Sequence, residues 1–153
     1  MDNYTAKICA TSRASLTVFF LLIGWVSCAD SADVVVIVNK SNPVTSMSSA
    51  QVSDLYLGRS RTFPDGSIAH VIDHAREAPL REEFFRRING MPLNKVNTFW
   101  ARLAVSGQIM PPVTKTNSGD VILAVQEDSK AIGYVEDSPL IDGVVIQVLR
   151  LHD

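Results

Sequence analysis

The sequence predicts an α/β domain in which helices flank a mixed β-sheet, and two patterns support this prediction. The first is a continuous β-branched run, Val34 to Val38, which is typical of a strand buried on both faces of a sheet. The second is the alternation of helical segments with further short apolar runs, which favours a layered α/β architecture. The length of 153 residues indicates one domain rather than two.

The elements that follow the first strand have clear start and stop signals. A helix is expected to begin after Ser48, because Ser48 and Gln51 form a capping box, and to end at Gly58. The Pro-Asp-Gly sequence at 64–66 predicts a turn. Ile68–Ile72 then predicts a short strand.

The second half of the chain is expected to contain three more helices. One runs over Pro79–Ile88, with acidic residues near its start and arginines near its end, as the helix dipole favours. Another opens at Pro92 and stops at Gly107, and a third is capped by Asn117 or Ser118. Two final strands complete the domain, Ala131–Val135 and Val144–Leu149.

Residues 1–29 have the pattern of an export signal. Lys7 and Arg13 supply a positive start, an apolar run follows, and the small residues Ser27-Cys28-Ala29 form a cleavage site. The apolar run is about 11 residues long, shorter than the roughly 20 that a membrane span requires. We therefore predict a cleaved signal peptide and a periplasmic domain over residues 30–153 without a membrane span.

Two alternatives for this segment are an uncleaved N-terminal anchor and a lipid attached at Cys28. Trp25 fits the lipoprotein alternative poorly, because lipoprotein processing favours an aliphatic residue three places before the cysteine. Cys9 and Cys28 are the only cysteines, so the mature domain is expected to contain no disulfide, thiolate metal site or cysteine nucleophile. A formal net charge of −2 argues against a nucleic-acid-binding domain, which is typically basic.

Three sequence blocks resemble, in order, those of phosphate-type ABC transporter substrate-binding proteins. They are VSDLYLGRSRTFPDGSIAHVID at 52–73, LREEFFRRINGM with VNTFWARLAVSGQIMPP at 80–112, and AIGYVEDSPL at 131–140. The resemblance implies a periplasmic-binding-protein type II fold and a solute-binding role. About 120 mature residues make only about half of a two-lobed binding protein, which implies a single-lobe or reduced domain.

The family's phosphate-holding turn, which resembles Arg-x-x-Gly-Ser-Gly-Thr, is altered here. The matching stretch is 74–80, His-Ala-Arg-Glu-Ala-Pro-Leu. It has no hydroxyl group, Pro79 lacks an N–H, and Glu77 adds a negative charge. Phosphate binding in the family's manner is therefore not expected.

Two groups of residues are candidates for ligand binding. Asn39, Ser41 and Asn42 follow the first strand, where open α/β sheets place ligands, and Ser48 lies at the next helix start. Arg76 and Arg81 belong to an arginine-rich stretch suited to an anionic solute or an acidic partner. For the first group, the structural alternative is a helix cap and a solvated loop. For the arginines, it is local neutralisation by nearby acidic residues.

Other chemistry has little support in the sequence. His70, Asp73 and His74 suggest a metal site, but His70 and Asp73 point to opposite faces of a strand. No catalytic motif is visible, Trp100 is most simply a core residue, and we expect neither a metal nor a cofactor. The sequence therefore predicts a non-catalytic, extracytoplasmic solute-binding-like protein for a small anion. The alternative is a partner-binding module that contacts a membrane transporter or sensor without a small ligand.

Overall fold

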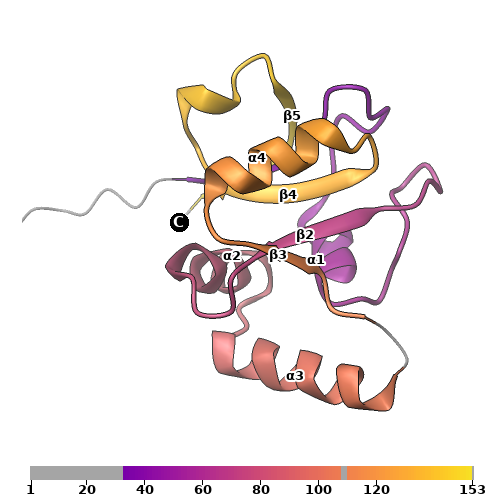
Figure 1. Cartoon of the computed structure of the whole chain (residues 1–153), viewed down its shortest axis with the longest axis vertical. Coiled ribbons are helices and arrows are strands. Elements are labelled where there is room, and N and C mark those ends of the chain that lie inside the picture. The colour runs from indigo at the N-terminus through magenta and orange to yellow at the C-terminus, as the bar shows by residue number, and fades with distance from the viewer. Residues whose placement is uncertain (1–32, 108–109, 153) are drawn as a thin grey trace, which may run out of the picture.

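The computed structural model describes residues 33–107 and 110–152. The predicted signal peptide, its cleavage site and both cysteines lie outside the described residues. Helices surround a central sheet, as the sequence predicts (Figure 1). In chain order the elements are β1 (Val34–Asn39), α1 (Ser49–Tyr56), β2 (His70–His74), α2 (Pro79–Asn89), α3 (Leu93–Ser106), β3 (Val113–Lys115), α4 (Ser118–Glu127), β4 (Ala131–Glu136), the 3₁₀ turn η1 (Pro139–Ile141) and β5 (Val145–Leu151).

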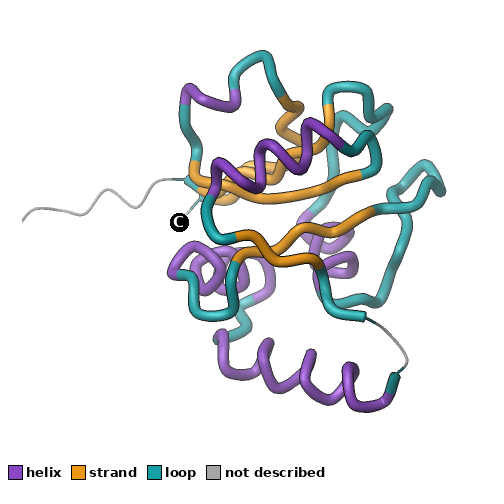
Figure 2. The backbone as a smooth tube through the Cα atoms, viewed as in Figure 1, coloured by secondary structure: helices purple, strands orange, loops and turns teal. Residues whose placement is uncertain are grey.

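The sheet is mixed, which confirms the predicted fold class. Its five strands lie in the order β3-β2-β4-β1-β5 (Figure 2). β2 pairs in parallel with β3 and β4, whereas β1 pairs antiparallel with β4 and β5. The carboxyl end of β1 therefore lies at the opposite end of the sheet from the carboxyl ends of β2 and β4. The loop after β1 therefore lies at the other end of the sheet from the loops after β2 and β4.

The side chains of β1 enter two separate cores. Val34, Val36 and Val38 pack in the core that contains α1 and α2, whereas Val35 and Ile37 pack in the core that contains α4. All of them are 0% exposed, as a continuous β-branched run predicts. In Figure 1, α4 lies in front of the sheet, and α1 and α2 lie behind it.

Close packing of α4 on the sheet depends on a glycine in β4. A Cβ atom at Gly133 would lie 2.6 Å from Cγ1 of Val121 and 3.2 Å from Cγ2 of Val125, both on α4. No side chain fits this gap without movement of the helix or its valines. None of the helices within 33–107 and 110–152 has the length and apolar character needed to cross a membrane.

The predicted boundaries differ from the structure at β2 and β3. The strand expected at Ile68–Ile72 begins at His70, because Ile68 instead forms an isolated bridge with Thr62 across the Pro-Asp-Gly turn. β3 was not expected, because its three residues form an edge strand without an apolar run. Of the two candidate caps for α4, the structure uses Asn117, whose side chain accepts a hydrogen bond from the N–H of Asp120.

α2 carries a cluster of charges that extends into its last turn. Glu83 accepts hydrogen bonds from Arg86 and Arg87, and Nε of Arg86 lies 2.9 Å from Oε2 of Glu83. The Glu83–Arg87 contact is an i,i+4 pair with the acid nearer the amino end, the order that stabilises a helix. The bond from Arg86, followed by that from Arg87, lowers the pKa of Glu83 to about 2 despite the opposing effect of burial.

We expect Glu83→Gln to reduce the acid sensitivity of the fold. The folded-state pKa lies below the usual value of 4.5, so the carboxylate stabilises the native state above about pH 5. This contribution is lost as the pH falls towards 2. It should amount to about 1 kcal/mol, because solvent around Arg86 weakens the pair. Urea unfolding of the wild type and of Glu83→Gln at pH 7 and pH 3 measures this contribution. If the difference in unfolding free energy between the two proteins does not shrink at pH 3, the low pKa of Glu83 is contradicted.

Candidate functional site

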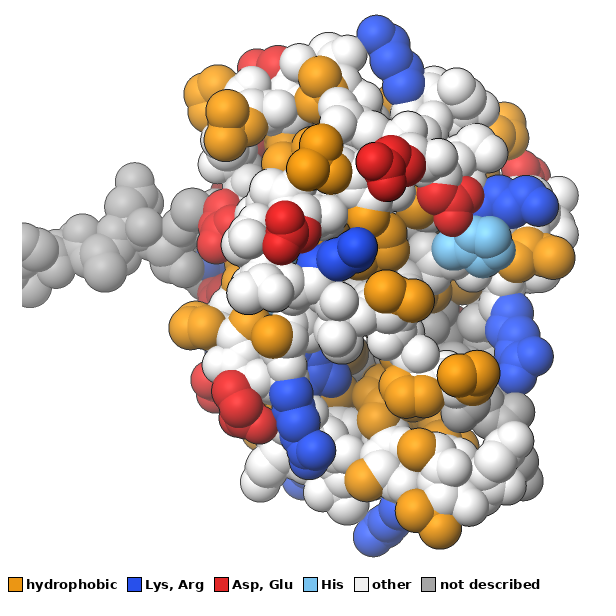
Figure 3. Space-filling view, in the orientation of Figure 1, with side chains coloured by type: hydrophobic (Ala, Val, Ile, Leu, Met, Phe, Trp, Pro, Cys, Tyr) orange, Lys and Arg blue, Asp and Glu red, His pale blue; other side chains and the backbone are white. Residues whose placement is uncertain are grey.

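A pocket of about 280 Å³ lies between α3 and the sheet edge formed by β2 and β3. α3 packs against α2 and stands away from the strands, at the bottom of Figure 1. Hydrophobic side chains gather over this part of the surface in Figure 3. The polar lining residues are Asp73, His74, Arg76, Arg81, Asn97 and Thr114, and the apolar ones are Trp100, Ala101, Ala104, Pro111 and Pro112.

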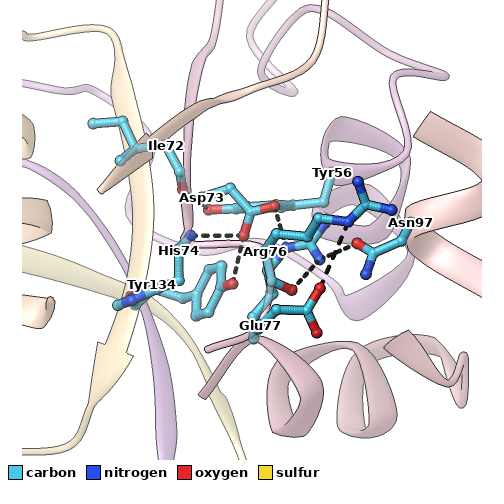
Figure 4. Close-up of polar contacts among 9 residues, drawn as sticks. Tyr56, Ile72, Asp73, His74, Arg76, Glu77, Asn97 and Tyr134 are labelled. Carbon is cyan, nitrogen blue, oxygen red and sulfur yellow. Dashed lines mark hydrogen bonds and ion pairs between the residues drawn. The ribbon is translucent and has the colours of Figure 1, made fainter. Parts of the chain in front are cut away.

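A buried ion pair forms the base of this pocket. Nε of Arg81, on α2, lies 2.8 Å from Oδ2 of Asp73, at the carboxyl end of β2, and the side chains are 6% and 3% exposed. The other oxygen of Asp73 accepts hydrogen bonds from the hydroxyl of Tyr134 at 2.6 Å and the backbone N–H of His74 at 2.8 Å (Figure 4). The buried carboxylate is thus fully engaged, as a charge in this environment must be.

The guanidinium of Arg81 is held in one orientation by several neighbours. Its Nη1 donates to Oδ1 of Asn97 on α3 at 2.7 Å and to the carbonyl of Arg76 at 3.3 Å. Its central carbon lies 5.2 Å from the ring centre of Phe85, which adds a cation–π contact. Arg81 therefore ties together β2, α2 and α3, the elements that enclose the pocket.

Two tyrosines and a histidine lie on the buried side of the Asp73–Arg81 ion pair. Burial, and then the charge of Asp73, raise the pKa of Tyr134 and of Tyr56 well above the usual value of 10, so both hydroxyls remain donors. The hydroxyl of Tyr56 donates to the carbonyl of Ile72 at 3.0 Å. Nε2 of His74 lies 2.9 Å from the carbonyl of Tyr134, so this nitrogen carries a proton and donates to that oxygen.

The charges that line the pocket favour an anion. Arg76 lies at its mouth with a 69% exposed side chain, and its Nε is 3.6 Å from Oε1 of Glu77, whose side chain is 82% exposed. Such an exposed pair is weak and easily exchanged for another partner. The lining itself contains two arginines, Arg76 and Arg81, against one aspartate, Asp73.

The structure brings together only two of the six predicted ligand-binding residues. Arg76 and Arg81 line the pocket, whereas Asn39, Ser41, Asn42 and Ser48 do not. A ligand bound after the first strand would meet the loops after β2 and β4 only if β1 ran parallel to its neighbours. Because β1 is antiparallel to β4, the loop after it lies at the other end of the sheet.

The residues at that other end make local contacts. The amide of Asn39 donates to the carbonyls of Val125 and Gln126, both at 2.8 Å, and that of Asn42 donates to the carbonyl of Ser129 at 3.1 Å. These bonds attach the loop to the end of α4. Ser41 is exposed, with its backbone N–H bound to Oδ1 of Asn39, and Ser48 caps α1 in the predicted capping box.

The histidines considered as metal ligands face different partners. Nδ1 of His70 lies 2.6 Å from Oδ2 of Asp128, while Asp73 binds Arg81. His74 is buried against Tyr134. Within the part of the chain that the structure describes, no three His, Cys, Asp or Glu residues are grouped to hold a metal ion.

Sequence reasoning did not identify Asp73, Asn97 or Thr114 as members of one site. Asp73 does leave a local signal, since a carboxylate inside an apolar strand requires a buried cation nearby. Arg81, eight residues later on an otherwise amphipathic helix, is a suitable partner. Asn97 and Thr114 leave no comparable signal, because polar residues on helices and edge strands are common.

Comparison with solved structures finds several with the same arrangement of helices and strands. The chain is similar in fold to phosphate-transport receptors. A protein from Clostridium perfringens, assigned as a phosphate ABC transporter substrate-binding protein and solved with bound phosphate, matches with a TM-score of 0.60 and 20% identity over 76% of this chain and 45% of its own. An ABC-type phosphate transport receptor from Vibrio cholerae has a TM-score of 0.58 at 15% identity, covering 76% of this chain and 46% of its own.

PstS from Borrelia burgdorferi also matches, with a TM-score of 0.58 and 10% identity over 80% of this chain and 50% of its own. The chain thus spans about half the length of the structures it matches. No model of a known protein family matches it, and no curated protein does. The likeness shows the fold, which is the periplasmic-binding-protein type that the sequence blocks predict.

Proposed function

We propose that this protein is an extracytoplasmic, non-catalytic solute-binding-like protein that binds a small anion in the pocket between α3 and the β2–β3 edge. The observation that supports this most directly is the fixed Arg81, which is buried, oriented by Asp73 and Asn97, and lines the pocket. Arginines held in this way recognise anionic groups with defined geometry.

The fold and the sequence of the N-terminus add independent support. The solved structures of similar fold include receptors for phosphate transport, and one of them contains phosphate. The export signal predicted at residues 1–29 is consistent with a periplasmic location. The altered stretch at 74–80 means that any anion would be held by different groups from the family's hydroxyl-rich turn.

Calorimetric titration of the purified protein with inorganic phosphate, sulfate, acetate and benzoate at two pH values tests the proposal. We expect at least one anion to bind at millimolar concentration or below. Ala104→Phe should abolish that binding, because Ala104 lies in the pocket wall. Val105→Phe is the matched control, since the neighbouring side chain is 90% exposed and lies outside that wall. No binding of any of the four anions would contradict the proposal.

A second candidate is a module that binds a membrane transporter or sensor. It is favoured by large apolar side chains that are exposed around the end of α3 and the start of β3: Val105 at 90%, Met110 at 88% and Val113 at 64%. Capture of one specific membrane protein by the wild type, lost in Val105→Ser with Val113→Thr, would favour this candidate. Equal capture by both proteins would count against it.

A further inference from the structure

We infer that the anion taken by this pocket is a small organic carboxylate with an apolar body rather than inorganic phosphate. This inference rests on the proposed anion-binding function and adds the chemical class of the ligand. It follows from three features: the apolar wall, the complete hydrogen bonding of Asp73, and the few unused hydrogen-bond donors on the residues that line the pocket.

The wall of the pocket is apolar over most of its extent. Trp100, Ala101 and Ala104 contribute one side from α3, and Pro111 and Pro112 contribute another from the segment that leads into β3. Both prolines lack a backbone N–H, so this segment offers no main-chain donors at these positions. A phosphate ion exposes oxygens in every direction, and burial of those oxygens against such a wall without hydrogen bonds is costly. An apolar ligand body gains free energy from the same contact.

The charged group of the ligand is restricted to an anion. Asp73 is 2% exposed, and its oxygens are occupied by Arg81, Tyr134 and the N–H of His74. An ammonium group would therefore find no available carboxylate in the pocket lining. The net charge of the lining, with Arg76 and Arg81 against Asp73, disfavours a cation further.

A small number of donors are available for that anion. Nη2 of Arg81 and Nδ2 of Asn97 make no hydrogen bond to any residue that the structure describes, although the same two side chains are joined through Nη1 and Oδ1. The indole Nε1 of Trp100 is also without a partner among the described residues, although it is buried. Arg81 and Asn97 both line the pocket and are in contact, so each has a planar group with a further donor that suits an oxygen of one carboxylate.

The size of the pocket suits a small ligand. A volume of about 280 Å³ lies just below the range typical of ligand sites, roughly 300–1,000 Å³. A carboxylate with one ring or a short alkyl chain is of a size that this volume holds. Benzoate and butyrate are therefore suitable probes of the chemical class.

Titration of the ¹⁵N-labelled protein with benzoate, butyrate and inorganic phosphate, followed by NMR, tests the inference. We expect both carboxylates to shift the indole N–H resonance of Trp100 and to bind at least tenfold more tightly than phosphate. Asn97→Leu should weaken carboxylate binding about tenfold or more, because it removes a donor and releases Arg81. Asn94→Leu, at an exposed position one turn earlier on α3, is the matched control and should bind as the wild type does.

The outcomes separate this inference from the function on which it rests. Phosphate binding as tight as that of benzoate would overturn the carboxylate inference and leave the anion-binding function in place. Failure of every anion to bind would remove both. If Asn97→Leu unfolds, Ala104→Phe and its control Val105→Phe test the same point. Benzoate binding that survives Ala104→Phe would contradict a site in the pocket between α3 and the β2–β3 edge.

Discussion

Asp73→Asn should destabilise the protein by about 3–5 kcal/mol, one of the two largest losses we expect from a single substitution in this chain. The substitution keeps the size of the side chain but leaves the guanidinium of Arg81, which is 6% exposed, without its counter-charge. It also weakens the hydrogen bonds that the carboxylate accepts from Tyr134 and His74. Urea unfolding, followed by circular dichroism at pH 7, measures the loss.

The matched control is Asp54→Asn, which removes a carboxylate from an exposed pair. Asp54 lies 3.5 Å from Arg59, and their side chains are 47% and 64% exposed, so we expect less than about 1 kcal/mol. Arg81→Met added to Asp73→Asn should recover part of the stability, because it removes the unpaired buried charge. A loss at Asp73 no larger than that at Asp54 would show that the pair does not support the fold.

Phe84→Ala should cost about 3–5 kcal/mol through loss of buried aromatic contacts. Phe84 is 0% exposed and stacks on Tyr134, with ring centres 3.8 Å apart and an angle of 7° between the planes. It also meets Tyr56 and Phe85 edge-on, at 4.7 and 5.2 Å. A cavity at this place would leave Tyr134 free to move away from Asp73, so damage to the core should extend to the base of the pocket.

Thermal and urea unfolding measure this second loss, and Phe99→Ala provides the same chemical change in a different environment. Phe99 is only partly buried on α3, where it contacts Trp100 edge-on at 5.9 Å. We expect its truncation to cost less than half as much, since less apolar area returns to water. Equal losses at the two positions would contradict the central place of Phe84 in the core.

The sequence by itself determined the elements whose signals are local. The β-branched run of β1, the capping box of α1 and the proline at the start of α2 each depend on residues within a few positions of one another. They predicted strand burial and helix starts, and the structure confirms them. The order of the family-like blocks also predicted the fold type, which the similarity to solved structures supports.

Only the tertiary structure decided the direction of β1, the presence of the edge strand β3 and the position of the pocket. Strand direction depends on which distant segments exchange hydrogen bonds, and a run of valines is compatible with either direction. For this reason Asn39 and Asn42 lie away from Arg76 and Arg81 instead of beside them. The contact between Arg81 and Asn97 likewise forms because α3 packs on α2, and no local pattern in the sequence records that packing.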